Sequence, residues 1–444
     1  MATKGDLIEA QNFSRRRLLT AFVSGAPGGK ELQPAAPLRA VVAAIALTVL
    51  VVLVGVFYGF IRPGLPNGWQ NGKLVLVSDT GARFVTVDGV LHPVINTASA
   101  RLLLPANDFG VISTDQHTLE GTPVGSTLGI AGAPDELPPR SGLINNGWSA
   151  CVTDDTKLDV RISSTGGPAP ATGRAAVVSS DGILHVILGE RSFTVTNTDK
   201  DAVLRAAGIA ALDPVPVPAD WIDLFTSGET LAPIIEPNFG QPVAGTGLRV
   251  GDVIRQAGSS EDDRFLVETG GALTSLTPLA WQLYQLGSGS ALNGKVVEVT
   301  GAEIAALPTS KLVKGQDWPA KGFDTIAKGQ RLCASLAPGE KQSTTVLATQ
   351  SSAIATSAGI TVEPSHGALV RAGGRGDQST SLLTLVDATG TAYPLPGATD
   401  ETLARLGYSP GDVGAISDGW TALLRTGPAL SEEAAGKTPD ASSG

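Results

Sequence analysis

An uncharged stretch at residues 40–61 constrains the fold of this chain more than any other feature. Its 22 residues include no Asp, Glu, Lys, Arg, Asn, Gln or Pro. A helix rises about 1.5 Å per residue, so this stretch would be about 33 Å long and could cross a hydrocarbon core of about 30 Å. We therefore predict a single transmembrane helix at 40–61, between a short segment (1–39) and a large body (62–444).

The distribution of charge predicts which side of the membrane each part occupies. Residues 1–39 carry six cations and three anions, and the whole chain has a net charge of −10, which leaves −13 for the remainder. Lys and Arg near a span resist translocation, so we expect a cytoplasmic N-terminus and an extracytoplasmic body anchored in the cell membrane. An acidic body with no basic block argues against nucleic acid as a partner.

A cleaved export signal is the competing interpretation of the N-terminal region. Residues 14–19 read Ser-Arg-Arg-Arg-Leu-Leu and are similar to a twin-arginine motif. However, more than twenty residues separate the arginines from the apolar stretch. That stretch exceeds the usual signal core of about 7–15 residues and lacks an A-x-A-like cleavage site after it. An uncleaved anchor is favoured. The helical pattern at 6–24 predicts a helix on the inner membrane surface, a helix docked on a cytoplasmic partner, or a solvated basic helix.

The body contains an internal repeat with a specific signature. Residues 221–231 and 420–430 both read Trp-x-x-Leu-hydrophobic-x-x-Gly-x-x-Leu, and a glycine stands thirteen residues before each tryptophan. The signature residues are Trp221, Gly228, Trp420 and Gly427. Agreement at so many positions without a gap indicates two copies of one structural unit.

Each copy is predicted to consist of a strand pair followed by a helix that begins at a threonine and ends at a glycine. Thr198 and Thr399 are the expected N-caps, and Gly208 and Gly407 the expected left-handed ends. Two looser copies show Asn96 as a possible cap and Thr277-Pro278 as a helix start. We place four repeats at about 73–139, 180–234, 264–312 and 380–430.

The segments between the repeats predict a second structural element. Residues 140–179, 235–263 and 313–379 contain strand-like runs and are expected to form one central β domain. Cys151 and Cys333 lie in the first and third of these segments and can pair in an oxidising compartment. Closing a loop of about 180 residues would stabilise the fold by on the order of 4–5 kcal/mol. Two unrelated buried thiols are the alternative. Residues 431–444 are expected to be a disordered tail.

High Gly (54) and Pro (29) with few aromatic residues (5%) favour many short strands and turns. The predicted fold class is therefore a single-pass membrane protein with an α+β, mainly β ectodomain (62–430), in which four strand-helix repeats surround a central β domain.

The sequence contains no clear motif for catalysis, phosphate binding or metal binding. The nearest match to a phosphate-binding loop, residues 431–438, begins with Ser in place of Gly, holds two carboxylates and follows no strand. No G-x-S-x-G or H-E-x-x-H occurs, and the four histidines lack metal-ligand spacing. We predict no catalytic residue, no cofactor and no metal. Gly55 and Gly59 form a G-x-x-x-G inside the span, whose face can contact a partner helix or only lipid.

Three segments of the chain resemble a known family. Residues 12–22 before the span, Trp69 after it and residues 91–102 resemble EccB, a membrane component of the actinobacterial type VII (ESX) secretion system. The most specific part includes His92, Pro93, Asn96, Ser99 and Arg101. We interpret these five as a structural turn and helix, with Asn96 capping and Arg101 fixing a neighbouring segment. A peptide- or glycan-binding surface is the alternative.

The resemblance implies a subunit of a secretion core complex. Its implied partners are the FtsK-type ATPase EccC, the multispan protein EccD, EccE, a mycosin protease and further copies of the same chain. The leading hypothesis is a non-catalytic, membrane-anchored scaffold for protein export. An extracytoplasmic ATP-hydrolysing subunit is a second hypothesis, which rests on a family label without a Walker motif. A module that binds the cell envelope is the third.

Overall fold

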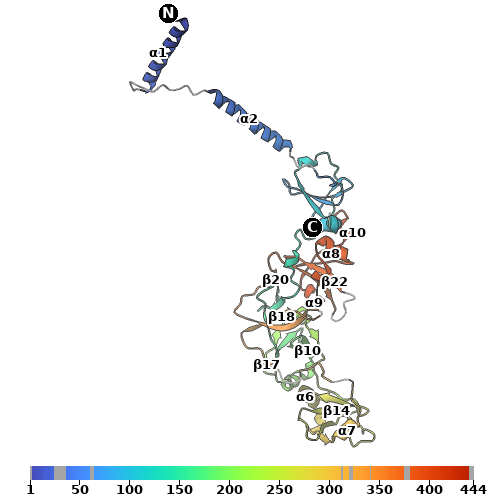
Figure 1. Ribbon diagram of the computed structural model, residues 1–444. Helices are drawn as coiled ribbons and strands as arrows, with labels where there is room; N and C mark the ends of the chain where they lie inside the picture. Colours follow the sequence, from blue (N-terminus) through green and yellow to red (C-terminus); the bar gives the residue numbers. More distant parts are fainter. Residues whose placement is uncertain are drawn as a thin grey trace. The chain divides into compact units, whose positions relative to one another are not determined.

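The computed structural model describes residues 3–24, 37–60, 65–311, 314–319, 324–340, 342–374 and 381–439. These residues belong to two compact units, Met1–Pro66 and Asn67–Gly444 (Figure 1).

The N-terminal unit contains two helices, α1 (Lys4–Ser24) and α2 (Pro37–Phe60). Within α2, Leu38–Tyr58 forms an apolar stretch of 21 residues, long enough to cross a membrane. This is the helix predicted at 40–61, except that residue 61 lies outside the described part. Length and composition suit a membrane span.

The second unit contains four repeats with one topology. Three antiparallel strands form a meander, a helix follows the third strand, and a fourth strand returns parallel to the first. Repeat 1 comprises β1 (Lys73–Val77), β2 (Arg83–Val87), β3 (Val90–Pro93), α3 (Thr97–Leu103) and β4 (Gly110–Thr114). Repeat 2 comprises β8 (Arg174–Ser180), β9 (Ile183–Leu188), β10 (Arg191–Val195), α4 (Lys200–Ala206) and β11 (Val215–Pro216).

The other two repeats keep this order. Repeat 3 comprises β13 (Val253–Gln256), β14 (Arg264–Val267), β15 (Leu273–Leu276), α6 (Pro278–Leu286) and β16 (Val297–Val299). Repeat 4 comprises β21 (Ala368–Gly373), β22 (Leu382–Val386), β23 (Thr391–Pro394), α8 (Asp400–Leu406) and β24 (Gly414–Ser417).

A short helix follows the fourth strand in every repeat. These helices are η2 (His117–Leu119), α5 (Ala219–Ile222), α7 (Gly301–Ala305) and α9 (Asp418–Ala422). In repeats 2 and 4 an extra strand then pairs in parallel with the third strand, namely β12 (Thr226–Ser227) and β25 (Arg425–Thr426). Outside the central sheet described below, the other elements are η1 (Ala106–Asp108), η3 (Arg140–Gly142), η4 (Asn197–Asp199), η5 (Ser288–Leu292), η6 (Pro410–Asp412), α10 (Glu432–Ala435) and β17 (Asp324–Thr325). The last of these, β17, pairs with β8.

The central sheet has the strand order β20-β6-β5-β18-β19-β7. Its strands are β5 (Trp148–Val152), β6 (Leu158–Ile162), β7 (Ala169–Pro170), β18 (Gln330–Ala337), β19 (Thr344–Ser351) and β20 (Gly359–Val362). All six come from the first and third predicted connectors. The second connector, 235–263, contributes no strand to this sheet and instead contains β13 of repeat 3. A mainly β ectodomain with repeats around a central sheet was the predicted fold class, and it is confirmed.

Each repeat has three strands before the helix and not the predicted pair, and three of the four repeats begin earlier than expected. In repeats 2, 3 and 4 the first strand lies in what we expected to be a connector, because our boundaries started at the first recognisable hairpin. The C-terminal segment also differs from the expected tail: α10 forms there, Ala435 is buried, and Gly129 donates its amide to the Lys437 carbonyl at 3.1 Å.

The helix ends follow the predicted chemistry with one exception. The side chains of Asn96, Thr277 and Thr399 each accept a hydrogen bond from a backbone amide of the first turn. Gly407 has a φ of +94° and Gly208 a φ of +76°, the left-handed conformation expected at helix ends. Thr198 was a wrong prediction. It lies inside η4, which runs directly into α4.

Candidate functional site

The disulfide between Cys151 and Cys333 joins the middle of the central sheet. The two residues face each other on the antiparallel neighbours β5 and β18, with their Cα atoms 4.0 Å apart and a sequence separation of 182. Both are buried against Ala348. The predicted pairing is therefore confirmed, and it links the two segments that build the sheet.

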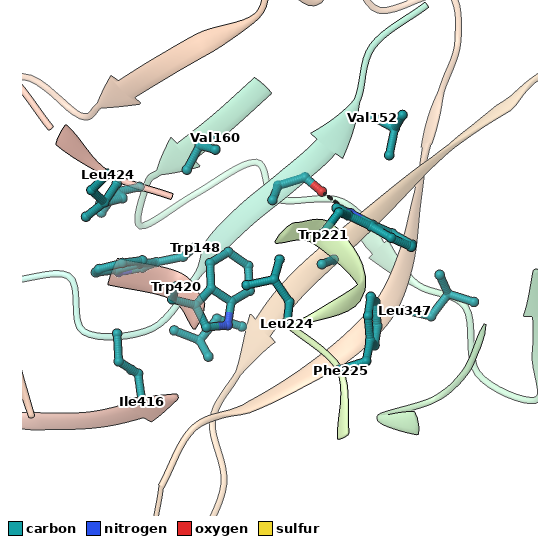
Figure 2. Packing of buried hydrophobic residues seen from close by; sticks show 14 of the residues in the cluster. Trp148, Val152, Val160, Trp221, Leu224, Phe225, Leu347, Ile416, Trp420 and Leu424 are labelled. Carbon is teal, nitrogen blue, oxygen red and sulfur yellow. Dashed lines mark hydrogen bonds between the residues drawn. The ribbon is translucent and has the colours of Figure 1, made fainter. Parts of the chain in front are cut away.

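The signature tryptophans of repeats 2 and 4 dock these repeats onto the central sheet. Trp221 on α5 and Trp420 on α9 are completely buried. The Trp221 Nε1 donates to the Ala150 carbonyl of β5 at 2.9 Å (Figure 2). The Trp420 Nε1 donates to Thr345 Oγ1 of β19 at 2.9 Å. Both repeats thus use a buried tryptophan in the same way: its indole N–H donates a hydrogen bond to the central sheet.

A third tryptophan completes this joint and escaped sequence reasoning. Trp148 on β5 is completely buried, and its ring meets that of Trp420 edge-on, with centroids 6.2 Å apart at 90° (Figure 2). Its Nε1 donates to the Ile144 carbonyl at 2.7 Å. Its position three residues before Cys151 was the available signal. We call Trp148, Trp221, Trp420 and the disulfide the central joint.

The signature glycines are explained by close approach to an aromatic ring. A Cβ on Gly228 would lie 2.5 Å from the ring of Phe193, and one on Gly427 would lie 2.5 Å from the ring of Tyr393. Each glycine amide also donates to the neighbouring third strand, at 2.9 Å and 2.8 Å respectively. Burial, followed by the charge of Asp387, raises the pKa of Tyr393 to about 12.

The stretch with the most specific family resemblance ties the start of α3 to residue 130. Asn96 Oδ1 accepts from the Ser99 amide at 3.0 Å, while its Nδ2 donates to the Ile130 carbonyl at 2.8 Å. Ser99 Oγ accepts from the Ile130 amide at 2.9 Å. Both side chains are buried, so they satisfy backbone groups and do not face solvent.

The other residues of this stretch also make internal contacts. His92 Nδ1 lies 3.1 Å from the Ser126 carbonyl, and the Pro93 carbonyl accepts from the Leu128 amide at 2.8 Å. The Arg101 guanidinium lies 4.7 Å from the centre of the Phe109 ring and beside Gly407 of repeat 4. These contacts favour the structural interpretation of the stretch.

The outer repeats are held by their helices. Repeat 1 contacts repeat 4: Arg405 Nη1 donates to the Leu102 carbonyl at 2.9 Å, and the Tyr408 hydroxyl donates to the Pro138 carbonyl at 2.8 Å. Repeat 3 contacts repeat 2 through α6 and α4, which share one apolar cluster. The central joint therefore lies between two pairs of repeats.

A buried ion pair adds to the junction near repeat 3. The Lys314 ammonium pairs with the Glu236 carboxylate, whose side chain is 3% exposed. Burial, followed by the charges of Glu236 and Asp252, raises the pKa of Tyr284, whose hydroxyl donates to the Gly251 carbonyl at 2.6 Å.

The segment 431–438 that came nearest to a phosphate loop has another structure. Ser431 caps α10 by accepting from the Ala434 amide, and Lys437 pairs with Glu433 at 2.7 Å. Its lysine and capping hydroxyl are therefore engaged within the segment. Among the residues that the structure describes, no group of three or more His, Cys, Asp or Glu side chains is placed to hold a metal ion.

The glycine pair in the span can be placed only in part. A Cβ on Gly55 would have no atom of this chain within 4 Å. The surroundings of Gly59 lie outside the described residues.

A scan of protein families matches residues 1–443 to the family described as type VII secretion system ESX-1, transport TM domain B. A curated relative is the ESX-5 secretion system ATPase EccB5 of Mycobacterium tuberculosis. It is 29% identical over 310 residues, which are 65% of this chain and 59% of that protein. The chain thus aligns with little more than half the length of this relative.

Two solved structures share the fold. A chain of the intact ESX-5 inner membrane complex has a TM-score of 0.64 at 21% identity, covering 100% of this chain and 97% of that one. A chain of the EccB3 dimer from the ESX-3 core complex has a TM-score of 0.63 at 19% identity, covering 82% and 99%.

Proposed function

The chain belongs to the EccB family, the transport domain B family of the type VII secretion system, and we propose that it is a membrane-anchored structural subunit of a type VII secretion core complex. The observation that carries this proposal is the match over residues 1–443, which includes the apolar helix, the central sheet and all four repeats. In this role the protein supports export without catalysing a reaction.

The geometry of the central joint supports a scaffold. Trp221 and Trp420 occupy the same signature position in repeats 2 and 4. Both are completely buried and donate a hydrogen bond to the central sheet. Side chains that bind or transform a substrate must be accessible to it, whereas these two tryptophans are enclosed in the core. A joint of this kind favours a rigid platform for other subunits.

We assign the partners by the same proposal. They are the FtsK-type ATPase EccC, the multispan protein EccD, EccE, a mycosin protease and further copies of this chain. The segment before the span (1–39) lies on the cytoplasmic side and the body outside, as the positive charge before the span predicts. The Gly55 surface of α2 is the proposed contact with a partner helix.

Co-purification tests the proposal. Tagged full-length protein, extracted in mild detergent, is expected to retain the FtsK-type ATPase and the multispan protein. The double variant Gly55→Leu/Gly59→Leu should lose part of this retention. Ala46→Leu is the matched control, because nine residues at 100° each place Ala46 on the opposite side of the helix. A wild-type protein that elutes alone contradicts the proposal.

Orientation is tested separately by alkaline phosphatase fusions, since this enzyme folds only outside the cytoplasm. A fusion after residue 444 is expected to be active and one before residue 1 inactive. The reverse result would invert the assigned topology.

The name of the curated relative supplies one competing function, since it is called an ATPase. Binding of a non-hydrolysable ATP analogue to purified full-length protein separates the two functions. We expect no saturable binding. Saturable binding, with hydrolysis that co-elutes with the protein, would replace the scaffold by an ATP-hydrolysing subunit.

A further inference from the structure

A cavity of about 430 Å³ lies where the central sheet meets the sheet of repeat 2. Its walls come from the end of β5, the start of β18, the middle of β8 and residues 211–216. This volume falls within the range of about 300–1,000 Å³ that small-ligand sites occupy. Arg331 lines the cavity with a side chain that is only 7% exposed.

The charge of Arg331 is held by a carboxylate that is itself in water. The Nη1 of Arg331 donates to the Ile354 carbonyl at 2.9 Å, and its Nη2 donates to Asp154 Oδ1 at 3.2 Å. The Asp154 side chain is 94% exposed. A buried guanidinium requires a close anion, whereas an exposed carboxylate loses little by rotating into solvent. Asp154 can therefore be displaced by a carboxylate from outside.

Arg331 also lines a second cavity, which Asp155 lines as well. This second cavity, of about 430 Å³, is further lined by Asp154 and residues 354–358. Asp154 therefore has space into which it can move.

The neighbouring strand offers backbone groups to an extended chain. On this edge of β8, β17 pairs with Arg174 and Ala175, and β11 pairs with Val178 and Ser179. The register of neither strand includes residues 176 and 177, which line the cavity; successive residues face opposite edges, so only Val177 shares this edge with Ser179, whose carbonyl accepts from the Val217 amide. A gap in the edge of a sheet is the place where a short peptide strand can add.

The remaining walls are mixed: they include the carboxylate of Asp213 and the polar Gln330, and an apolar part that suits small aliphatic side chains. Val215, Ile326 and Leu332 line the cavity, and Lys328 adds a second cation beside them. Since a guanidinium binds a carboxylate with two parallel hydrogen bonds, the combination suits a peptide that ends in this apolar space.

We propose that this cavity binds the free carboxyl terminus of an extended peptide with small aliphatic side chains. The carboxylate replaces Asp154 on Arg331, and the peptide backbone passes the gap at Val177. The site is preformed, because the disulfide ties β18, which carries Arg331 two residues before Cys333, to β5, whose following turn carries Asp154 three residues after Cys151.

Titration of full-length protein in detergent with acetyl-Val-Ala-Val tests the site. The peptide with a free carboxylate is expected to bind at least about tenfold more tightly than its C-terminal amide, by ligand-observed NMR. Arg331→Met should lose at least about tenfold in affinity, and Arg331→Lys, which keeps the charge but not the fork, should lose less. Asp154→Asn should bind the peptide more tightly, because the internal competitor is gone.

The control is Lys157→Ala, a cation of the same turn that lines neither cavity and should leave binding unchanged. Equal affinity of acid and amide, or weaker binding by Asp154→Asn, overturns the proposal. Both comparisons use folded protein even if Arg331→Met misfolds. Inorganic phosphate is the second probe. If it competes as strongly as the peptide and depends equally on Arg331, the cavity is a general anion site and the peptide assignment is wrong.

Discussion

Removing the Trp420 side chain tests whether repeat 4 is held by the central joint. This side chain is completely buried, donates to Thr345 Oγ1 at 2.9 Å and meets the edge of Trp148. Truncating a buried tryptophan to alanine costs about 3–5 kcal/mol through lost burial and the cavity that remains. We therefore expect Trp420→Ala to lower the free energy of unfolding by about this amount.

The hydrogen bond can be separated from the packing. Trp420→Phe keeps a ring but removes the donor, and Thr345→Val removes the acceptor and leaves the indole N–H buried without a partner. Each should cost about 1–3 kcal/mol. The double variant should lose less free energy of unfolding than the two single variants together, with a coupling energy of about 1 kcal/mol. The reason is that both single variants break the same hydrogen bond.

The assay is urea unfolding of full-length protein in detergent, followed by far-UV circular dichroism so that loss of a tryptophan does not alter the signal. Trp69→Ala is the matched control, because Trp69 is only half-buried and does not belong to the apolar cluster around the central joint. It should change the free energy by about 0.5 kcal/mol or less. A Trp420→Ala effect no larger than that of the control would refute the role of the central joint.

Three further outcomes follow from the same geometry. Gly228→Ala should destabilise the protein by about 1–3 kcal/mol through overlap with the Phe193 ring, measured by the same urea titration. Replacing Cys151 and Cys333 together by serine should lower stability by up to about 5 kcal/mol for a loop of 182 residues, and a reductant should then have no further effect. Burial lowers the pKa of His185, although the charge of Asp223 opposes this. The neutral ring is thus favoured in the fold, and its contribution is complete above the unfolded pKa of about 6.5 and is lost as pH falls through the folded value. His185→Gln should therefore lose less stability than wild type between pH 7.5 and pH 5.5.

Local patterns in the sequence predicted those parts of the fold that local chemistry decides. The apolar helix, the caps at Asn96 and Thr277 and the left-handed glycines each depend on residues within a few positions of one another. The cysteine pair was also predictable, because there are only two cysteines and both fall in the body. Thr198 failed since a turn of 3-10 helix takes its place before α4.

Long-range pairing decided the parts that were missed. The first strands of repeats 2, 3 and 4 form hydrogen bonds with a fourth strand about 35–45 residues later, and no short-range pattern reveals a parallel partner at that distance. The site at Arg331 was invisible for the same reason. Asp154 lies 177 positions from Arg331, and the gap in β8 exists only once three separate segments are assembled around it.

The difference between clear and loose repeats has a physical cause in the position of each copy. Repeats 2 and 4 both pack against the central sheet, so their short helices α5 and α9 both carry a tryptophan for it. Repeats 1 and 3 pack on neighbouring repeats through α3 and α6, and their short helices η2 and α7 contain no tryptophan. The topology is the same in all four copies, but only the two inner copies meet the same surface. The Trp-x-x-Leu signature therefore indicates that a repeat packs on the central sheet. It is not required by the repeat fold itself. It follows that a tryptophan placed in η2 or α7 would restore the sequence pattern without adding stability, since the repeats that carry those helices pack on neighbouring repeats through α3 and α6.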